Sequence, residues 1–128
     1  MKEVKIAIAG LGRVGCKFLM ELSSQAGCRI KIIAAVEADP DAPGVKIAED
    51  LKITVFREAS ELLKLGDQID VVFDLTGSVE FRKALRSGLA NSVNRHTVVA
   101  PEVIAFIVWD LITSSDEPFP DNHHVKGY

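Results

Sequence analysis

The sequence predicts an α/β fold: a doubly wound parallel sheet of five strands in the order 3-2-1-4-5, with helices on both faces. Short runs rich in valine and isoleucine alternate along the chain with longer segments whose apolar residues recur at helical spacing. The first of these runs is apolar on both faces, as expected for a strand buried between two helical layers. Strands that alternate with helices form βαβ units, and 128 residues suit one such domain.

Three of the expected strands lie in the first half of the chain, at residues 4–9, 29–36 and 52–56. An apolar stripe that recurs at every fourth residue predicts a first helix that begins at Arg13 and ends before Gly27. Residues 39–44 contain two prolines and a glycine, which predict a turn. We expect a short helix at residues 45–50 to follow that turn.

The second half of the chain contains strands at residues 70–75 and 96–100 and helices at residues 58–65, 79–89 and 101–113. Gly66 ends the first of these helices. Ser78 suits the N-cap of the second, where Glu80 lies near the favourable end of the helix dipole. Pro101 suits the first turn of the last helix.

A glycine-rich segment joins the first strand to the first helix, in the pattern Gly10-Leu11-Gly12-Arg13-Val14-Gly15. In this strand-to-helix context the pattern predicts the dinucleotide-binding turn of a Rossmann-like sheet. Gly10 permits the tight turn, Gly12 lets the backbone approach a pyrophosphate, and Gly15 lets the helix pack close to the sheet. The N-terminus of the helix offers N–H groups to the anion. Arg13 adds a cation there or remains solvated. The alternative is a glycine turn that only connects strand and helix.

Glu37 ends the second predicted strand, 22 residues after Gly15, at the spacing of a ribose-binding acid. A carboxylate at this point accepts hydrogen bonds from ribose hydroxyls and repels a 2′-phosphate. Asp39 adds negative charge, and no arginine or lysine follows Glu37 until Lys46. The expected cofactor is therefore NAD, with NADP less favoured. A solvated residue at the end of a strand is the alternative interpretation of Glu37.

Residues after the fourth strand are further candidates, because ligands of open α/β sheets bind beyond the carboxyl ends of the strands. We expect Thr76 and Gly77 to lie near the ribose or nicotinamide side of the crevice, although they also suit a simple strand-to-helix loop. Asp74 either contacts the ligand or binds loop N–H groups. Ala100 and Pro101 could border the same crevice.

Histidine and cysteine offer poor candidates for catalysis. We expect His96 at the end of its strand that faces away from the ligand, and we expect the adjacent His123 and His124 to be incidental. Cys16 follows the glycine motif, but burial as a small apolar side chain is the favoured interpretation. Cys16 and Cys28 together match no zinc or redox motif.

Charge and hydropathy exclude several classes of partner. With 15 basic and 18 acidic residues the net charge is −3, which argues against general binding of nucleic acid. No apolar run approaches the roughly 20 residues that span a bilayer. Without a recognisable signal peptide, a chain with thiols is expected in the cytoplasm.

The last predicted helix, at residues 102–113, is apolar nearly all round and needs cover on two sides. The sheet provides one side. A second copy of the chain, in a homodimer, or a missing domain provides the other, unless Phe119 of the tail folds over it. We assign residues 1–114 to the dinucleotide-binding domain and residues 115–128 to an irregular C-terminal tail.

The segments IAIAGLGRVG (residues 6–15) and VVFDLT (residues 71–76) resemble the N-terminal cofactor domain of dihydrodipicolinate reductase. Homoserine and aspartate dehydrogenases are similar at this level. The resemblance implies NAD(P) binding by residues of the glycine motif, by Glu37 and by Thr76. Such reductases carry their catalytic basic residues in a second domain, for which this chain leaves little room. In the related glucose-fructose oxidoreductase group a Glu-Lys-Pro motif follows strand five, where this sequence has Ala100-Pro101-Glu102. The layout also resembles Rossmann modules attached to bacterial sensor kinases.

Three functions follow from these features. The favoured one is a dinucleotide-binding module without a complete catalytic site, acting as a regulatory or sensor domain. The second is the cofactor-binding part of an oxidoreductase, similar to dihydrodipicolinate reductase, whose substrate domain is absent. The third is a binder of CoA or another adenine nucleotide. The fold alone does not choose between them.

Overall fold

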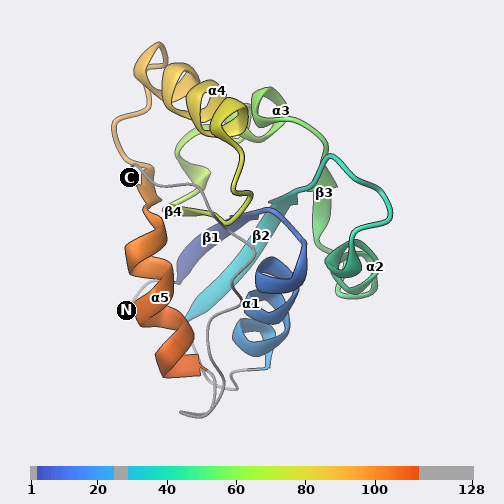
Figure 1. Ribbon diagram of the computed structural model, residues 1–128. Helices are drawn as coiled ribbons and strands as arrows, with labels where there is room; N and C mark the ends of the chain where they lie inside the picture. Colours follow the sequence, from blue (N-terminus) through green and yellow to red (C-terminus); the bar gives the residue numbers. More distant parts are fainter. Residues whose placement is uncertain (1–2, 25–28, 113–128) are drawn as a thin grey trace.

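The computed structural model describes residues 3–24 and 29–112, and it confirms the predicted α/β fold (Figure 1). Within those residues five parallel strands form one sheet in the order β3-β2-β1-β4-β5. The strands are β1 (Val4–Ala9), β2 (Ile30–Val36), β3 (Thr54–Phe56), β4 (Val71–Asp74) and β5 (Val98–Ala100).

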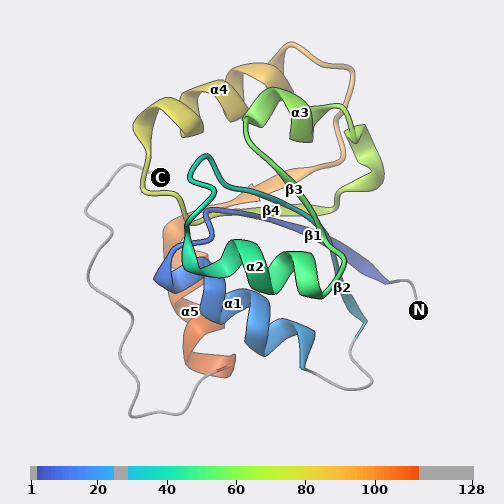
Figure 2. The same cartoon turned by 90° about the vertical axis from the view of Figure 1, so that its right-hand side faces the viewer.

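The helices form two layers, one on each face of the sheet (Figure 2). They are α1 (Arg13–Ser23), α2 (Pro43–Asp50), α3 (Ala59–Leu63), α4 (Val79–Ala90) and α5 (Glu102–Ile112), with a short 3-10 helix at Gly66–Gln68. Helices α1, α2 and α5 cover one face of the sheet, and α3 and α4 cover the other. The predicted arrangement of helices on both faces is therefore confirmed.

The central strand explains why both layers are needed. Along β1, Ile6 and Ile8 belong to the core beneath α1, α2 and α5, whereas Ala7 and Ala9 belong to the core beneath α3 and α4. All four side chains are buried. Successive residues of a strand point to opposite faces, so a strand that is apolar throughout must be covered twice.

Several predicted boundaries were wrong by one or two residues. Strand β3 begins at Thr54 rather than Lys52, because Lys52 adopts a left-handed backbone with φ of 62° and belongs to the turn. Strand β5 begins at Val98 rather than His96, because pairing with β4 starts only there. The helix predicted at residues 58–65 ends at Leu63, and Gly66, with φ of 59°, starts the 3-10 helix.

The start of one helix also differs from the prediction. Helix α2 begins at Pro43, two residues early, because proline fits the first helical position. Helix α1 ends at Ser23, and the N–H of Ser24 closes it by donating to the carbonyl of Met20 at 3.1 Å. The predicted cap at Gly27 lies outside the described residues. Ser78 caps α4 as predicted, its Oγ accepting from the N–H of Phe81 at 3.1 Å.

Helix α5 buries one side and exposes the other. Ala105 and Trp109 are buried, and Trp109 stacks on Phe18 of α1 with ring centroids 6.0 Å apart. Val103 and Leu111 remain 58% and 80% exposed. The second apolar side is thus present, and what covers it remains a prediction, since residues 113–128 with the predicted tail lie outside the described part. No helix among the described residues is long and apolar enough to cross a membrane.

Asp70 ties three strands together at the amino end of the sheet. Its carboxylate accepts the N–H of Lys5 at 2.7 Å, and its N–H donates to the carbonyl of Lys5 at 2.8 Å. The ring of His96 lies 2.5 Å from the second carboxylate oxygen. The bond from Lys5, followed by the hydrogen bond to His96, lowers the pKa of Asp70.

Replacing Asp70 by Asn is expected to lower stability at neutral pH and to matter less in acid. A carboxyl whose pKa falls on folding stabilises the fold above its unfolded pKa of about 3.9, and that contribution disappears as the pH falls through the lower folded value. Thermal unfolding midpoints of both proteins between neutral and strongly acidic pH measure this. A difference between the two midpoints that stays constant over this pH range would show that the charge of Asp70 does not stabilise the fold.

Candidate functional site

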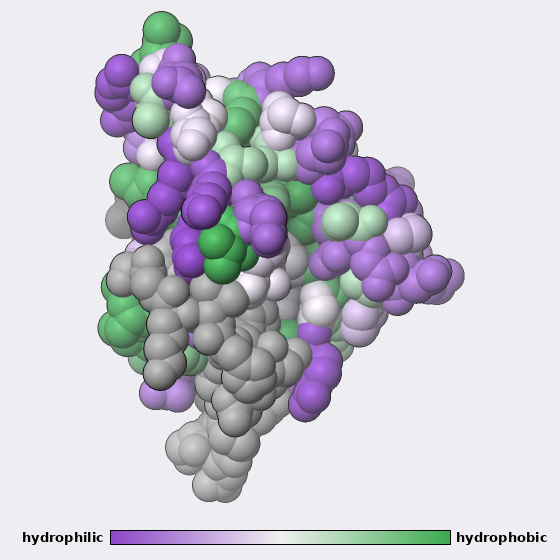
Figure 3. All heavy atoms as spheres, turned by 45° about the horizontal axis from the view of Figure 1, so that its top comes forward, coloured by the Kyte–Doolittle hydropathy of each residue, from purple (hydrophilic) through white to green (hydrophobic). Residues whose placement is uncertain are grey.

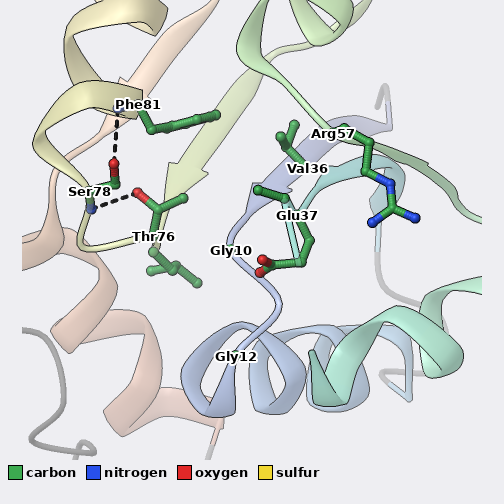
Figure 4. Close-up of a pocket in the computed structure, with 10 residues that line it drawn as sticks. Gly10, Gly12, Val36, Glu37, Arg57, Thr76, Ser78 and Phe81 are labelled. Carbon is green, nitrogen blue, oxygen red and sulfur yellow. Dashed lines mark hydrogen bonds between the residues drawn. The ribbon is translucent and has the colours of Figure 1, made fainter. Parts of the chain in front are cut away.

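A cleft of about 330 Å³ opens at the carboxyl ends of β1, β2, β3 and β4 (Figure 4). It lies at the carboxyl ends of the neighbouring strands β1 and β4, where the strand order reverses and where open α/β sheets bind their ligands. In the view of Figure 3, hydrophilic side chains surround smaller apolar areas on the part of the surface that is coloured by hydropathy. The cleft is lined by Gly10, Gly12, Val36, Glu37, Ala38, Arg57, Leu75, Thr76, Ser78 and Phe81.

The three glycines of the loop differ in the space around them. Gly10 has φ of 94°, and a Cβ built on it would lie 2.8 Å from the main chain of Leu75. A Cβ on Gly15 would lie 1.7 Å from the carbonyl oxygen of Gly10. Gly12 has no atom within 4 Å of such a Cβ. Gly10 and Gly15 are therefore required by the fold itself, whereas Gly12 borders open space at the start of α1.

The Glu37 carboxylate reaches back from the end of β2 to the glycine loop. One oxygen accepts the N–H of Leu11 at 2.7 Å, and the other accepts the N–H of Asp39 at 2.9 Å. In the close-up the carboxylate points toward Gly10 and Gly12 (Figure 4). Glu37 is therefore no freely solvated residue at a strand end: it holds the loop and also forms part of the cleft wall.

The carbonyl of Leu11 is fixed as firmly as its N–H. The N–H of Gly44, in the first turn of α2, donates to that carbonyl at 2.8 Å. A Cβ on Gly44 would lie 2.9 Å from the Cβ of Leu11, so only glycine permits this approach. Sequence reasoning treated Gly44 as part of a turn and missed this contact, for which the Pro43-Gly44 pair at a helix start was the available signal.

The other residues of the motif take different positions. The side chains of Leu11 and Val14 are wholly buried in the core, so these residues can offer a ligand only their main chain. Arg13 is exposed, and it does not line the cleft. Gly77, with φ of 66°, also lies outside the lining.

The turn after β4 is held by a chain of hydrogen bonds. Asp74 is 3% exposed, and its Oδ1 accepts from the hydroxyl of Thr76 at 2.7 Å and from the N–H of Thr76 at 3.1 Å. The Thr76 hydroxyl in turn accepts the N–H of Ser78 at 3.0 Å (Figure 4). Asp74 thus binds loop groups, one of its two predicted roles, and Thr76 lines the cleft with its hydroxyl proton already engaged.

The lining residues that the sequence analysis missed include Arg57, directly after β3, and Phe81, in the first turn of α4. Arg57 was overlooked because the search for cations followed the chain from Glu37, whereas β3 lies beside β2 in the sheet. The predicted strand order could have placed Arg57 next to Glu37. No sequence signal distinguished Phe81 from a core residue of its helix.

The remaining candidates do not meet at the cleft. His96 lies at the amino end of the sheet, where it binds Asp70, as its predicted position away from the ligand requires. Burial raises the pKa of the half-buried Cys16 thiol, which disfavours the reactive thiolate. Ala100 and Pro101 do not line the cleft. Cys28, His123 and His124 lie outside the described residues, and the residues that are described contain no group of three histidine, cysteine or acidic side chains able to hold a metal.

The sheet order and the glycine loop define a Rossmann-like domain. The chain is similar to acetaldehyde dehydrogenase 2 of Azotobacter vinelandii, with 33% identity over 98 residues that make up 70% of this chain and 31% of that protein. It is also similar to acetaldehyde dehydrogenase 2 of Mycolicibacterium vanbaalenii, with 35% identity over 77 residues, 58% of this chain and 24% of that protein. No family model matches the chain.

Among solved structures, apo scyllo-inositol dehydrogenase from Lactobacillus casei shares the fold, with a TM-score of 0.55, 20% sequence identity and coverage of 87% of this chain and 33% of that one. The chain thus spans about a third, or less, of the length of the proteins it matches. These similarities support a Rossmann-like domain of the oxidoreductase type. The finer resemblance to dihydrodipicolinate reductase is not tested by them.

Gly15→Ala is expected to destabilise the fold by about 1–3 kcal/mol or more, because the new methyl group would collide with the carbonyl oxygen of Gly10, a main-chain atom. Gly12→Ala is the matched control and should change the unfolding midpoint little, since its methyl group meets no atom within 4 Å. Chemical denaturation of the two variants checks the difference. Equal stabilities would show that the close contact of helix and loop is not required.

Glu37→Ala is expected to cost about 1–3 kcal/mol of stability, because it leaves the N–H of the buried Leu11 without its acceptor. Glu37→Gln retains a carbonyl oxygen for one of the two N–H groups and should lose less. Denaturant unfolding of both variants measures how much stability each of them loses. A Glu37→Ala protein as stable as the wild type would show that the Glu37 carboxylate is not needed to hold the glycine loop.

Proposed function

We propose that the cleft binds a nicotinamide dinucleotide, NAD(H) in preference to NADP(H). One observation carries the proposal: the open space at Gly12 lies at the N-terminus of α1, beside the carboxylate of Glu37. The first turn of a helix has N–H groups without helical partners and a partial positive charge, which suit a pyrophosphate. A carboxylate at the end of the neighbouring strand suits the adenosine ribose.

Glu37 can serve the loop and a ligand at the same time. Each carboxylate oxygen has about two acceptor sites, and the hydrogen bonds to Leu11 and Asp39 use one on each oxygen. Ribose hydroxyls can donate to the remaining acceptor positions without breaking the hydrogen bonds from Leu11 and Asp39. A 2′-phosphate would meet this carboxylate and the nearby Asp39, so like charges favour NAD.

The cleft lacks the groups of a complete catalytic site among the described residues. Glu37 and Arg57 are the only charged side chains in its lining. The Thr76 hydroxyl donates to Asp74 and is not available as a proton donor. A bound nicotinamide supplies hydride transfer, which usually also requires a proton donor or acceptor near the substrate. We therefore propose a binding domain that acts as a regulatory or sensor module.

The second candidate is the cofactor-binding part of a larger oxidoreductase. The similarity to dehydrogenases about three to four times as long as the matched regions favours it. In that arrangement the proton donor and the substrate pocket would belong to another domain. Both candidates require the same dinucleotide site, so one binding experiment tests their shared basis.

Titration of the full chain with NADH should show saturable binding that Gly12→Val weakens at least about tenfold, or about 1.4 kcal/mol. The valine side chain would occupy the open space at the start of α1. Isothermal calorimetry with NADH, NADPH, ATP and CoA measures the preference.

The unfolding midpoint of Gly12→Val serves as the control and should stay near that of the wild type. Binding of CoA alone, or NADH binding unaffected by the valine, would overturn the proposal. Dehydrogenase activity that requires a second domain of the full-length gene product, and that the chain alone lacks, would favour the second candidate over the first.

A further inference from the structure

Arg57 places a cation on the rim of the cleft, at the carboxyl end of β3. The carbonyl of Phe56 accepts the N–H of Glu37 at 2.8 Å, so Arg57 follows directly on the residue that pairs with the end of β2. Its own N–H donates to the carboxylate of Glu61 at 2.9 Å, which anchors the main chain. The side chain is exposed, and the described residues provide no ion pair for it.

Phe81 stands on the opposite wall. Its main chain is fixed by Ser78, whose Oγ accepts the Phe81 N–H at 3.1 Å, and its ring extends toward the cleft (Figure 4). The ring is partly buried in the core beneath α3 and α4 and also lines the cleft. The cleft therefore has an aromatic side chain on one wall and an arginine on the other, with the apolar Val36 and Ala38 also in its lining.

We propose that Phe81 and Arg57 bracket the adenine ring of the bound dinucleotide and thereby make the site selective for adenine nucleotides. The proposal rests on the proposed function. A flat π-system matches both walls, because aromatic rings stack on one another and a guanidinium packs against a ring face. The Arg57 side chain can turn over the ligand from its anchored main chain. Glu37, on the same side of the cleft, takes the ribose that adjoins the adenine.

A contact between Arg57 and a 2′-phosphate is the competing role for this cation. The guanidinium is directed away from the Glu37 carboxylate (Figure 4), and that carboxylate lies where the ribose is expected. A phosphate drawn to Arg57 at this position would be repelled by Glu37. The adenine contact has no such opposition, since adenine is uncharged.

The test compares four ligands on the full chain: NADH, ADP-ribose, reduced nicotinamide mononucleotide and NADPH. Arg57→Ala and Phe81→Leu are each expected to weaken NADH and ADP-ribose by about 3- to 30-fold, the range of a cation–π contact. Binding of the mononucleotide, which has no adenine, should not change. Lys83→Ala removes one positive charge from an exposed position of α4 outside the cleft and should leave all four affinities unchanged.

Arg57→Lys refines the result, because it keeps the charge and loses the planar group, and it should also weaken NADH. Loss of NADPH affinity alone in Arg57→Ala would overturn the proposal and assign Arg57 to the phosphate. Unchanged NADH affinity in both variants would overturn the proposal while leaving the proposed function intact. A wild-type chain that does not bind NADH would overturn both together.

Discussion

The main chain of Leu11 is the constraint on which the rest of the structure depends. The Glu37 carboxylate accepts its N–H, the Gly44 N–H donates to its carbonyl, and its side chain is wholly buried. These contacts join the end of β2 and the start of α2 to the turn between β1 and α1. A buried peptide group must be hydrogen-bonded, so the loop cannot relax without leaving two polar groups unpaired. The conformation of the loop and the shape of the cleft are therefore one property of the molecule.

This coupling explains why one acidic residue has two roles. The carboxylate of Glu37 fixes the glycine loop and presents its remaining acceptor positions to the cleft. A residue that only bound a ligand could be exchanged at little cost to stability, whereas Glu37 could not. The part of the cleft wall that Glu37 forms is consequently fixed by the fold itself, as in sites built on rigid elements of a structure.

The parts of the structure that were predictable depend on local pattern. The order of the strands, the start of α1 and the cap at Ser78 follow from periodicity and from residues close in sequence. The lengths of the edge strands depend on strand pairing and not on the sequence pattern. Strands β3 and β5 have three residues each, fewer than their apolar runs indicate. The contact from Glu37 to Leu11 spans 26 positions, and Arg57 reaches the cleft only because β3 lies beside β2. Such contacts depend on tertiary structure and leave little trace in a single sequence.

The turn after β4 has a different consequence. Each hydrogen bond from Asp74 through Thr76 and Ser78 to Phe81 joins residues only two or three positions apart. The side chains of such a hydrogen-bonded corner have little freedom left to lose, whereas the exposed Arg57 side chain has many rotamers. The conformational entropy lost when a ligand binds would then come mainly from the wall that carries Arg57, because the wall that carries Phe81 is already fixed.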